Sequence, residues 1–219
     1  MNLKTLGLFV GYCFLIICFS ACTKTNDSSP QITYSNIAGI NATESGLFDF
    51  YINNSRAGNG LNPGDVVGYF SVLPTTNTVT FNVASTSSYV ATSNLDCTAG
   101  SFYSAFLGDG GSIVTAEDDR TAPQTGKARI RFVNMSTYLT GPIDFGATGG
   151  SKIITGIPPK SPTIYFEVDP AMTSISGYNA GTSTPLFSIP VSMQAGNVYV
   201  FYVAGTTNGT LTGKLLKQL

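Results

Sequence analysis

The sequence of 219 residues contains no histidine and no tryptophan. Without histidine, neither a Ser-His-Asp nor a Cys-His catalytic arrangement is possible, and histidine-ligated metal sites are excluded. Carboxylates are therefore the main groups left for acid–base catalysis. The lack of tryptophan removes the best flat platform for stacking against a sugar ring, although 11 tyrosines and 14 phenylalanines remain.

Charged residues are also scarce, at 11% of the chain against about a quarter in ordinary soluble domains. Eleven basic and twelve acidic residues give a formal net charge of −1. Because there is no basic excess to attract a polyanion, nucleic-acid binding is disfavoured. Hydrophobic residues make up 42%, enough to build packed cores, so the chain is not expected to be disordered.

The N-terminus has the pattern of an exported, lipid-anchored protein. Residues 1–4 form a short segment made positive by Lys4, and residues 6–19 form an uncharged apolar run that is too short to span a bilayer. The segment Phe19–Cys22 (FSAC) resembles the lipobox of bacterial lipoproteins, with phenylalanine where leucine is commonest. The resemblance implies cleavage before Cys22 and acyl chains on that residue, and two or more chains hold a protein stably at a membrane.

The residues after Cys22 bear on its destination. Thr23 and Lys24 follow it, without the aspartate that retains lipoproteins at the inner membrane of well-studied Gram-negative systems, so we expect an outer-membrane location. The alternative is an ordinary signal peptide in which Cys22 is incidental. If the signal is removed and Cys22 is lipidated, Cys97 has no partner, and we expect it to be a small buried side chain rather than a reactive thiol.

The mature chain is expected to contain two copies of one unit. Matched positions share residue type and order: Ile37 with Ile130, Ile40 with Val133, Asn41 with Asn134, Asp49 with Asp144, and Tyr103 with Tyr199. Residues 79–83 (VTFNV) are matched to residues 164–168 (IYFEV), which implies one insertion around residues 53–65 and another around residues 169–184. A repeat this long indicates a tandem domain duplication rather than a solenoid.

Alternating apolar side chains predict strands in each copy. In one strand, Ala128, Ile130 and Phe132 share a face opposite Lys127, Arg129 and Arg131; in another, Ile164, Phe166 and Val168 point inward while Tyr165, Glu167 and Asp169 face water. Residues 198–203 (VYVFYV) are apolar on both faces and predict a central strand. About seven short strands per copy, separated by turn residues, indicate an all-β protein of two antiparallel β-sandwich domains.

The predicted organisation has five segments. They are a lipoprotein signal peptide at residues 1–21, a flexible polar tether at 22–31, a β-sandwich domain at 32–119, a linker at 120–126 and a second β-sandwich domain at 127–219.

Residues 118–134 (DDRTAPQTGKARIRFVN) resemble the opening of a domain of unknown function, four-three-nine-seven in the usual numbering. That family is common as tandem copies in Gram-negative envelope lipoproteins. Asp144 falls where its Val-Asp-Val-Tyr strand has aspartate, and Ala195–Gly196 with Tyr199 and Gly205 match its later Ala-Gly-x-x-Tyr segment. The Ser-Pro-Asp-Ala-Pro turn of the family is absent, and the first copy is more divergent. The resemblance implies immunoglobulin- or transthyretin-like sandwiches and no established activity.

Few side chains are candidates for chemistry. Asp49 and Asp144 are matched between the copies, but one carboxylate per domain is not the pair that glycoside hydrolysis needs, and each is alternatively an exposed residue or an acceptor of turn hydrogen bonds. Glu167 and Asp169 share a strand face and are candidate cation ligands, or simply solvated, since calcium takes about six to eight oxygens. No catalytic residue, metal site or cofactor is assigned.

Other candidates have equally plain alternatives. The charged run at residues 117–120 is expected to be a solvated linker, and Arg129 and Arg131 either bind an anion or pair with acidic neighbours. Aromatic side chains that either cap a ligand groove or pack in a core are Phe102, Tyr103, Phe106, Tyr138 and Tyr178.

These observations favour a lipid-anchored protein of the cell envelope, without catalytic activity, that binds or adheres to a glycan or a protein through loop ends of its sandwiches. Its expected partners are the membrane, through acyl chains on Cys22, and that ligand. One alternative is a hydrolase of envelope or extracellular glycans that uses carboxylates such as Asp49 and Asp144. The other is a purely structural surface spacer.

Overall fold

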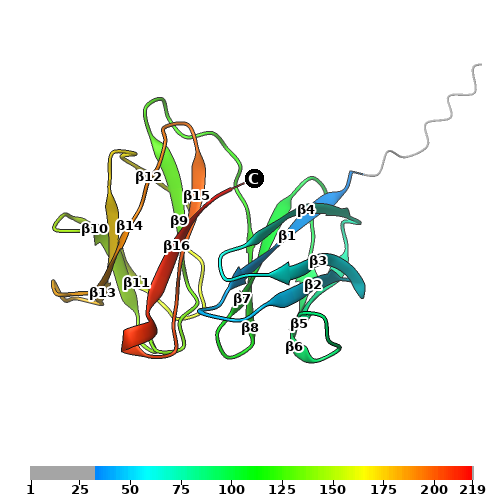
Figure 1. Ribbon diagram of the computed structural model, residues 1–219. Helices are drawn as coiled ribbons and strands as arrows, with labels where there is room; N and C mark the ends of the chain where they lie inside the picture. The colour runs from blue at the N-terminus through cyan, green and yellow to red at the C-terminus, as the bar shows by residue number, and fades with distance from the viewer. Residues whose placement is uncertain (1–32, 219) are drawn as a thin grey trace, which may run out of the picture. The chain divides into compact units, whose positions relative to one another are not determined.

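The computed structural model describes residues 33–218, shown in Figure 1. Within this range 16 β-strands form four sheets of four strands each, and the single helical element is a 3₁₀ turn, Asn208–Thr210. No helix in the described part of the chain has the length and apolar character needed to cross a bilayer. The predicted all-β class, with two sandwich-like halves, is confirmed. The predicted signal peptide and tether lie outside the described residues.

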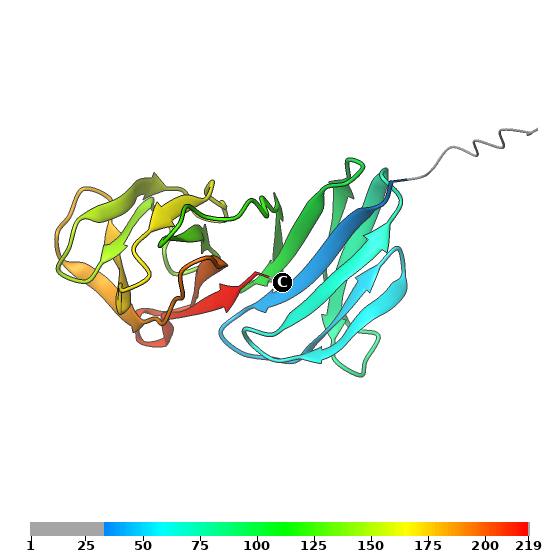
Figure 2. The ribbon, with the colours of Figure 1, turned by 90° about the horizontal axis from the view of Figure 1, so that it is seen from above.

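The first sandwich consists of the sheets β4-β1-β7-β8 and β3-β2-β5-β6. Its strands are β1 (Ser35–Ala42), β2 (Phe48–Ile52), β3 (Ser55–Leu61), β4 (Val66–Val72), β5 (Thr76–Val83), β6 (Tyr89–Asp96), β7 (Phe102–Gly108) and β8 (Ser112–Glu117). Figure 2 shows β1 in blue between its two neighbours β4 and β7. The pair β1–β7 is parallel, so the predicted antiparallel arrangement has one exception in this sandwich.

The second sandwich repeats this plan with the sheets β12-β9-β15-β16 and β11-β10-β13-β14. Its strands are β9 (Ala128–Asn134), β10 (Ile143–Ala147), β11 (Lys152–Ile157), β12 (Phe166–Val168), β13 (Ser174–Asn179), β14 (Pro185–Pro190), β15 (Val198–Ala204) and β16 (Thr212–Lys217). Strands β9 and β15 are again parallel. The strand predicted at residues 198–203 lies between β9 and β16, which confirms its central position.

Strand register supports the duplication. Ile37 faces Tyr103 in the first sandwich, and Ile130 faces Tyr199 in the second, as the sequence matches require. The match of residues 79–83 to residues 164–168 is wrong, however. Strand β12 pairs with β9 as β4 pairs with β1, so β12 is the counterpart of β4, and β13 is the counterpart of β5. Period-2 alternation does not distinguish one strand from the next, which is why the predicted insertions were misplaced.

The predicted facing of residues 164–169 is also partly wrong. Ile164 is 74% exposed, whereas Tyr165 is only 9% exposed. Strand β12 begins at Phe166, after an irregular segment that contains three prolines, so strict alternation does not extend back to residue 164. Glu167 does face outward as expected.

Each sandwich has its own hydrophobic core. In the first, the rings of Phe50 and Phe81 contact each other with centroids 4.9 Å apart. In the second, Phe132 stacks on Phe145 at 4.7 Å, and both contact Phe201. Phe50 and Phe81 are neighbours within one sheet, and they pack in a cluster with Ile37 and Leu107 of the facing sheet. In the second sandwich, Phe145 comes from the sheet that faces Phe132 and Phe201. Burial of this apolar surface holds the two layers of each sandwich together.

A third apolar cluster joins the two sandwiches, and the sequence did not predict it. It packs the outer face of β4-β1-β7-β8 against the outer face of β12-β9-β15-β16, with Ile40 and Phe106 from one side and Val133 and Tyr202 from the other. Residues 33–218 accordingly belong to one compact unit. Strands β1, β9 and β15 are therefore covered on both faces, which explains why β15 is apolar throughout.

Candidate functional site

Asp49, one of the two candidate acids, is an internal acceptor of hydrogen bonds. Its exposed fraction is 1%. Its Oδ1 accepts the backbone N–H of Gly60 at 2.8 Å, and its Oδ2 accepts the N–H of Ser85 at 3.2 Å. Both donors have positive φ, 59° and 60°, a conformation that brings their N–H groups toward the carboxylate. The Arg56 guanidinium lies 3.5 Å from Oδ2.

Asp144 repeats this arrangement in the second sandwich. Its carboxylate accepts the N–H of Gly156 at 2.7 Å and the N–H of Gly181 at 3.2 Å, and the Lys152 ammonium lies 3.1 Å away. Burial disfavours the charged carboxylate, but these hydrogen bonds and the ammonium outweigh that effect and hold the pKa of Asp144 below its usual value. Each of these aspartates thus ties a strand, β3 or β11, to a connection, β5–β6 or β13–β14. This is close to the second alternative offered from sequence, an acceptor of turn hydrogen bonds.

A buried polar cluster lies where the sandwiches meet. The Asp118 carboxylate accepts hydrogen bonds from Ser104 (2.6 Å), Tyr69 (3.0 Å), Tyr165 (3.2 Å) and Arg131 (3.0 Å). The Arg131 guanidinium also stacks over the Tyr165 ring at 4.3 Å. The side chains of Asp118 and Arg131 are 0% and 7% exposed. Asp118 is therefore an exception to the solvated linker predicted at residues 117–120, whereas Glu117, Asp119 and Arg120 are exposed.

Burial dominates the electrostatics of this cluster. It raises the pKa of Asp118, and the four hydrogen-bond donors offset part of that shift. The pKa values of Tyr69 and Tyr165 are raised by burial and by the neighbouring carboxylate, so both hydroxyls stay protonated donors at neutral pH. Perturbed groups of this kind often mark functional sites. Here every carboxylate contact is internal, and the cluster clamps one sandwich to the other.

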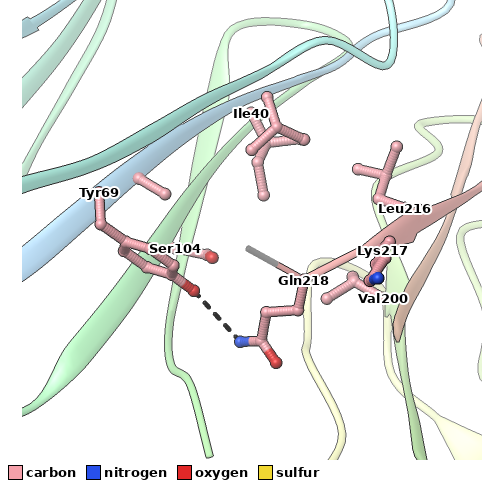
Figure 3. Close-up of a pocket in the computed structure, with 9 residues that line it drawn as sticks. Ile40, Tyr69, Ser104, Val200, Leu216, Lys217 and Gln218 are labelled. Atoms are coloured by element: carbon pink, nitrogen blue, oxygen red, sulfur yellow. Dashed lines mark hydrogen bonds between the residues drawn. The ribbon is translucent and has the colours of Figure 1, made fainter. Parts of the chain in front are cut away.

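A small cavity of about 20 Å³ lies beside the clamp, between the two sandwiches. Figure 3 shows Tyr69 and Gln218 at its edge, joined by a hydrogen bond from Gln218 Nε2 to the tyrosine hydroxyl at 3.2 Å. The remaining lining is largely aliphatic, including Ile40, Val200 and Leu216. A space of this size holds one water molecule at most, so it is a packing gap rather than a ligand site.

A second clamp lies at the opposite end of the same interface. The Asp109 carboxylate accepts the N–H of Glu44 at 2.9 Å and the N–H of Gly205 at 2.7 Å. The Glu44 carboxylate in turn accepts the N–H of Thr206 at 2.7 Å. The third apolar cluster is thus flanked by polar contacts on both sides, and this arrangement fixes the sandwiches as one body.

Other candidates from the sequence have internal partners. Arg129 pairs with Asp119 at 2.6 Å and with Glu167 at 3.8 Å. This is the alternative in which it pairs with acidic neighbours. Asp169 accepts the N–H of Ala171 in a turn. Among residues 33–218, no group of three or more acidic or cysteine side chains is arranged to hold a metal ion.

Cys97 and most of the candidate aromatic side chains pack in the interior. Cys97 is a free thiol, 7% exposed, and burial raises its pKa, as expected of an unreactive side chain. Tyr103, Phe106 and Tyr178 are buried, whereas Tyr138 is 42% exposed.

A groove of the first sandwich was not predicted. It has a volume of about 370 Å³ and lies between the edge strands β3 and β4, at the end where the β2–β3 turn and the β4–β5 loop meet. Arg56, with 54% of its side chain exposed, and Leu73, 52% exposed, lie along it together with Phe70. The local signal in the sequence was the turn pair Asn53-Asn54, which lies in the region misread as an insertion.

Hydrogen bonds between two asparagines preorganise this groove. Both Asn53 and Asn54 have positive φ, as a two-residue β-hairpin turn requires. The Asn53 amide donates to Asn77 at 2.8 Å, and Asn77 donates to the carbonyls of Leu73 and Thr75 at 3.0 and 2.8 Å. Asn77 is 1% exposed, so its hydrogen bonds join the β2–β3 turn to the β4–β5 loop from the interior of the sandwich.

The chain is similar to a solved structure and to a family of domains. A solved structure similar to it is a family 26 carbohydrate-binding module from Eubacterium rectale in complex with maltoheptaose, with 13% identity and a TM-score of 0.27, covering 85% of this chain and 97% of that one. A likeness of this degree does not extend to the residues of a binding site. No curated protein matches the sequence.

The family match includes residues 118–134 and Asp144, which suggested the family from sequence, and it also covers the first copy, the more divergent of the two. The model of a domain of unknown function, DUF4397, matches residues 35–146, which contain the whole first sandwich and the start of the second. The motifs that suggested this family lay mainly in the second copy. The match covers half of the chain, and the protein belongs to the DUF4397 family.

Proposed function

We propose that this protein is a non-catalytic, lipid-anchored binding protein of the outer membrane, attached through acyl chains on Cys22, and that it binds a glycan in the groove between β3 and β4. The groove carries the proposal. It combines an exposed guanidinium, amide and hydroxyl groups with the apolar surfaces of Phe70 and Leu73. Its volume of about 370 Å³ is in the range of small-molecule sites.

The chemistry of the groove suits a sugar. Hydroxyl groups of a pyranose ring exchange hydrogen bonds with guanidinium, amide and serine groups, and the C–H face of the ring packs on apolar side chains. Arg56 lies on the β3 edge, while Ser71 and Leu73 lie on the β4 side. One wall of the groove belongs to the sheet of β3 and the other to the sheet of β4. This favours a ligand inserted between the two walls over one that rests on the rim of the groove.

An added peptide strand fits this edge less well. The β2–β3 pairing shifts register twice, between Phe48 and Phe50 and between Phe50 and Tyr51, and the β1–β4 pairing shifts once. Irregular edges of this kind disturb the ladder that an incoming strand would extend. A hydrolase that relies on Asp49 and Asp144 is also disfavoured, because both carboxylates already accept two backbone N–H groups and face a cation.

The groove predicts how binding responds to substitution. For a glycan identified by array screening of the full-length protein in neutral detergent, Arg56→Ala is expected to weaken binding at least tenfold in calorimetric titration. The reason is the loss of a charge-assisted donor worth about 1.5–3 kcal/mol. Leu73→Ala is expected to weaken it severalfold by removing apolar surface from the groove.

Lys152→Ala is the matched control. It removes the corresponding cation from Asp144 in the second sandwich and leaves the groove intact, so glycan binding should be unchanged. Uniformly blank glycan arrays, or equal binding by wild type and Arg56→Ala, would contradict the proposal and favour the spacer role.

The anchor is tested separately. Cells that express the wild type and are fed an alkyne palmitate analogue should yield a labelled protein in the outer-membrane fraction. The Cys22→Ala variant should lose all label, because a Cys22 thioether precedes acylation of its amino group. Continued labelling of that variant would remove the anchor from the proposal without affecting the groove.

A further inference from the structure

A cationic depression lies where the linker after β8 meets the second sandwich. Arg120 from the linker, the turn at Gly196 and Asn197, and Lys217 and Gln218 at the end of β16 line it, with a volume of about 170 Å³. No carboxylate contributes to its lining. Two positive side chains from separate segments of the chain therefore share one small concave surface.

Neither Arg120 nor Lys217 is paired with a carboxylate in the part of the chain that the structure describes. The neighbouring Arg129 and Arg131 are both paired, the first with Asp119 and Glu167 and the second with Asp118. The nearby Asp118, Asp119 and Glu167 are thus engaged by other arginines, while the Glu117 carboxylate accepts a hydrogen bond from Ser101. The charges of Arg120 and Lys217 therefore have no counter-charge within residues 33–218.

Arg120 is held in position by aromatic rings. Its guanidinium lies 4.4 Å from the centroid of Phe102 and 5.4 Å from that of Tyr69, and the two rings meet edge to face at 5.0 Å. Stacking occupies the face of a guanidinium and leaves its N–H edge free to bind an oxyanion through two parallel hydrogen bonds. A preplaced arginine loses less conformational entropy on binding than a mobile one.

An unpaired acceptor supplies an independent indication of a ligand. Gln218 Oε1 is buried and has no hydrogen-bond partner among the described residues, while Gln218 Nε2 is committed to Tyr69. Two cations on one concave surface match a phosphate group, whose charged oxygens face Arg120 and Lys217. Its remaining P–OH donates to the Gln218 amide oxygen once that side chain turns to expose it. A phosphate with a second pKa near 6 to 7 retains that proton part of the time at neutral pH.

We infer that this depression binds a phosphate group, either free phosphate or the phosphate of a lipid headgroup. The site is separate from the β3–β4 groove and holds whether or not a glycan binds there. Both phosphate sources present the same tetrahedral oxyanion, and they differ only in what the fourth oxygen carries.

The test is calorimetric titration of the full-length protein in neutral detergent, at constant ionic strength, with two probes. One is inorganic phosphate, and the other is short-chain phosphatidic acid below its micelle concentration, with short-chain phosphatidylcholine as its blank. We expect saturable binding that weakens at least tenfold in Arg120→Gln and in Lys217→Gln. It should weaken severalfold in Arg120→Lys, which keeps the charge but loses the guanidinium edge that makes two parallel hydrogen bonds. Lys160→Gln, an exposed lysine of the β11–β12 connection, is the matched control and should bind like wild type.

Each outcome decides the inference. Binding of both probes supports a site for phosphate in general, and binding of phosphatidic acid alone supports a headgroup site. Binding of neither probe overturns the inference. Equal binding by wild type and Arg120→Gln, or equal weakening by Lys160→Gln, also overturns it, because the attraction would then be nonspecific.

Discussion

Replacing Asp118 with asparagine is expected to destabilise the protein by about 3–5 kcal/mol, because the change leaves the Arg131 guanidinium buried without a counter-charge. Asp118 accepts four hydrogen bonds, and its side chain is 0% exposed. An amide in its place presents an N–H₂ group toward donors on Ser104 and two tyrosines, so several of these bonds are lost as well. For a chain of this length, the midpoint of thermal unfolding should fall by about 10 °C or more.

The adjacent residue is a matched control for this prediction. Asp119→Asn also removes one carboxylate that pairs with an arginine, but Asp119 is 49% exposed. An exposed pair contributes about 0–1 kcal/mol, so the midpoint should move by only a few degrees. If the two variants melt at the same temperature, the buried clamp does not stabilise the interface as described here. A double variant, Asp118→Leu with Arg131→Met, should recover much of the loss, since apolar replacement of a whole buried pair is often tolerated.

The sequence predicted the strands well because their signal is local. Alternation of Ala128, Ile130 and Phe132 with polar residues reports one buried face wherever the strand ends up, and the fully apolar β15 reports two. The duplication was equally readable, since Asp49 and Asp144 serve the same purpose in both copies. Such features depend on residues that are close in sequence or repeated in order.

The interface and both candidate sites depend on contacts between distant parts of the chain. Nothing near Asp118 in the sequence distinguishes a buried clamp from a solvated acidic run, because its partners Tyr69 and Tyr165 come from other strands and loops. A sign of it was present in Arg131, which lies on a strand that is covered on both faces. The groove at Arg56 and the depression at Arg120 are each lined by segments that are distant in the sequence. No periodic pattern in the sequence indicates that these segments meet.

The third apolar cluster makes the two sandwiches unfold together, and Phe106→Ala is expected to separate them. Phe106 lies in β7, is 0% exposed, and packs with Val133 and Tyr202 of the other sandwich. Truncation of a buried phenylalanine costs about 3–5 kcal/mol, and here the loss falls on the coupling between the halves. Calorimetry should show one cooperative transition for the wild type and two for Phe106→Ala, because each half keeps its own core.

Phe81→Ala provides the comparison that separates coupling from core stability. Phe81 is also 0% exposed, but it packs within the first sandwich, so the same substitution lowers the stability of that core and leaves the interface intact. We therefore expect Phe81→Ala to melt in a single transition at a lower temperature. A single transition at that same lowered temperature in Phe106→Ala would show that the cluster is simply part of one core. Two transitions would establish that burial between duplicated sandwiches, rather than within them, makes the tandem pair one rigid body.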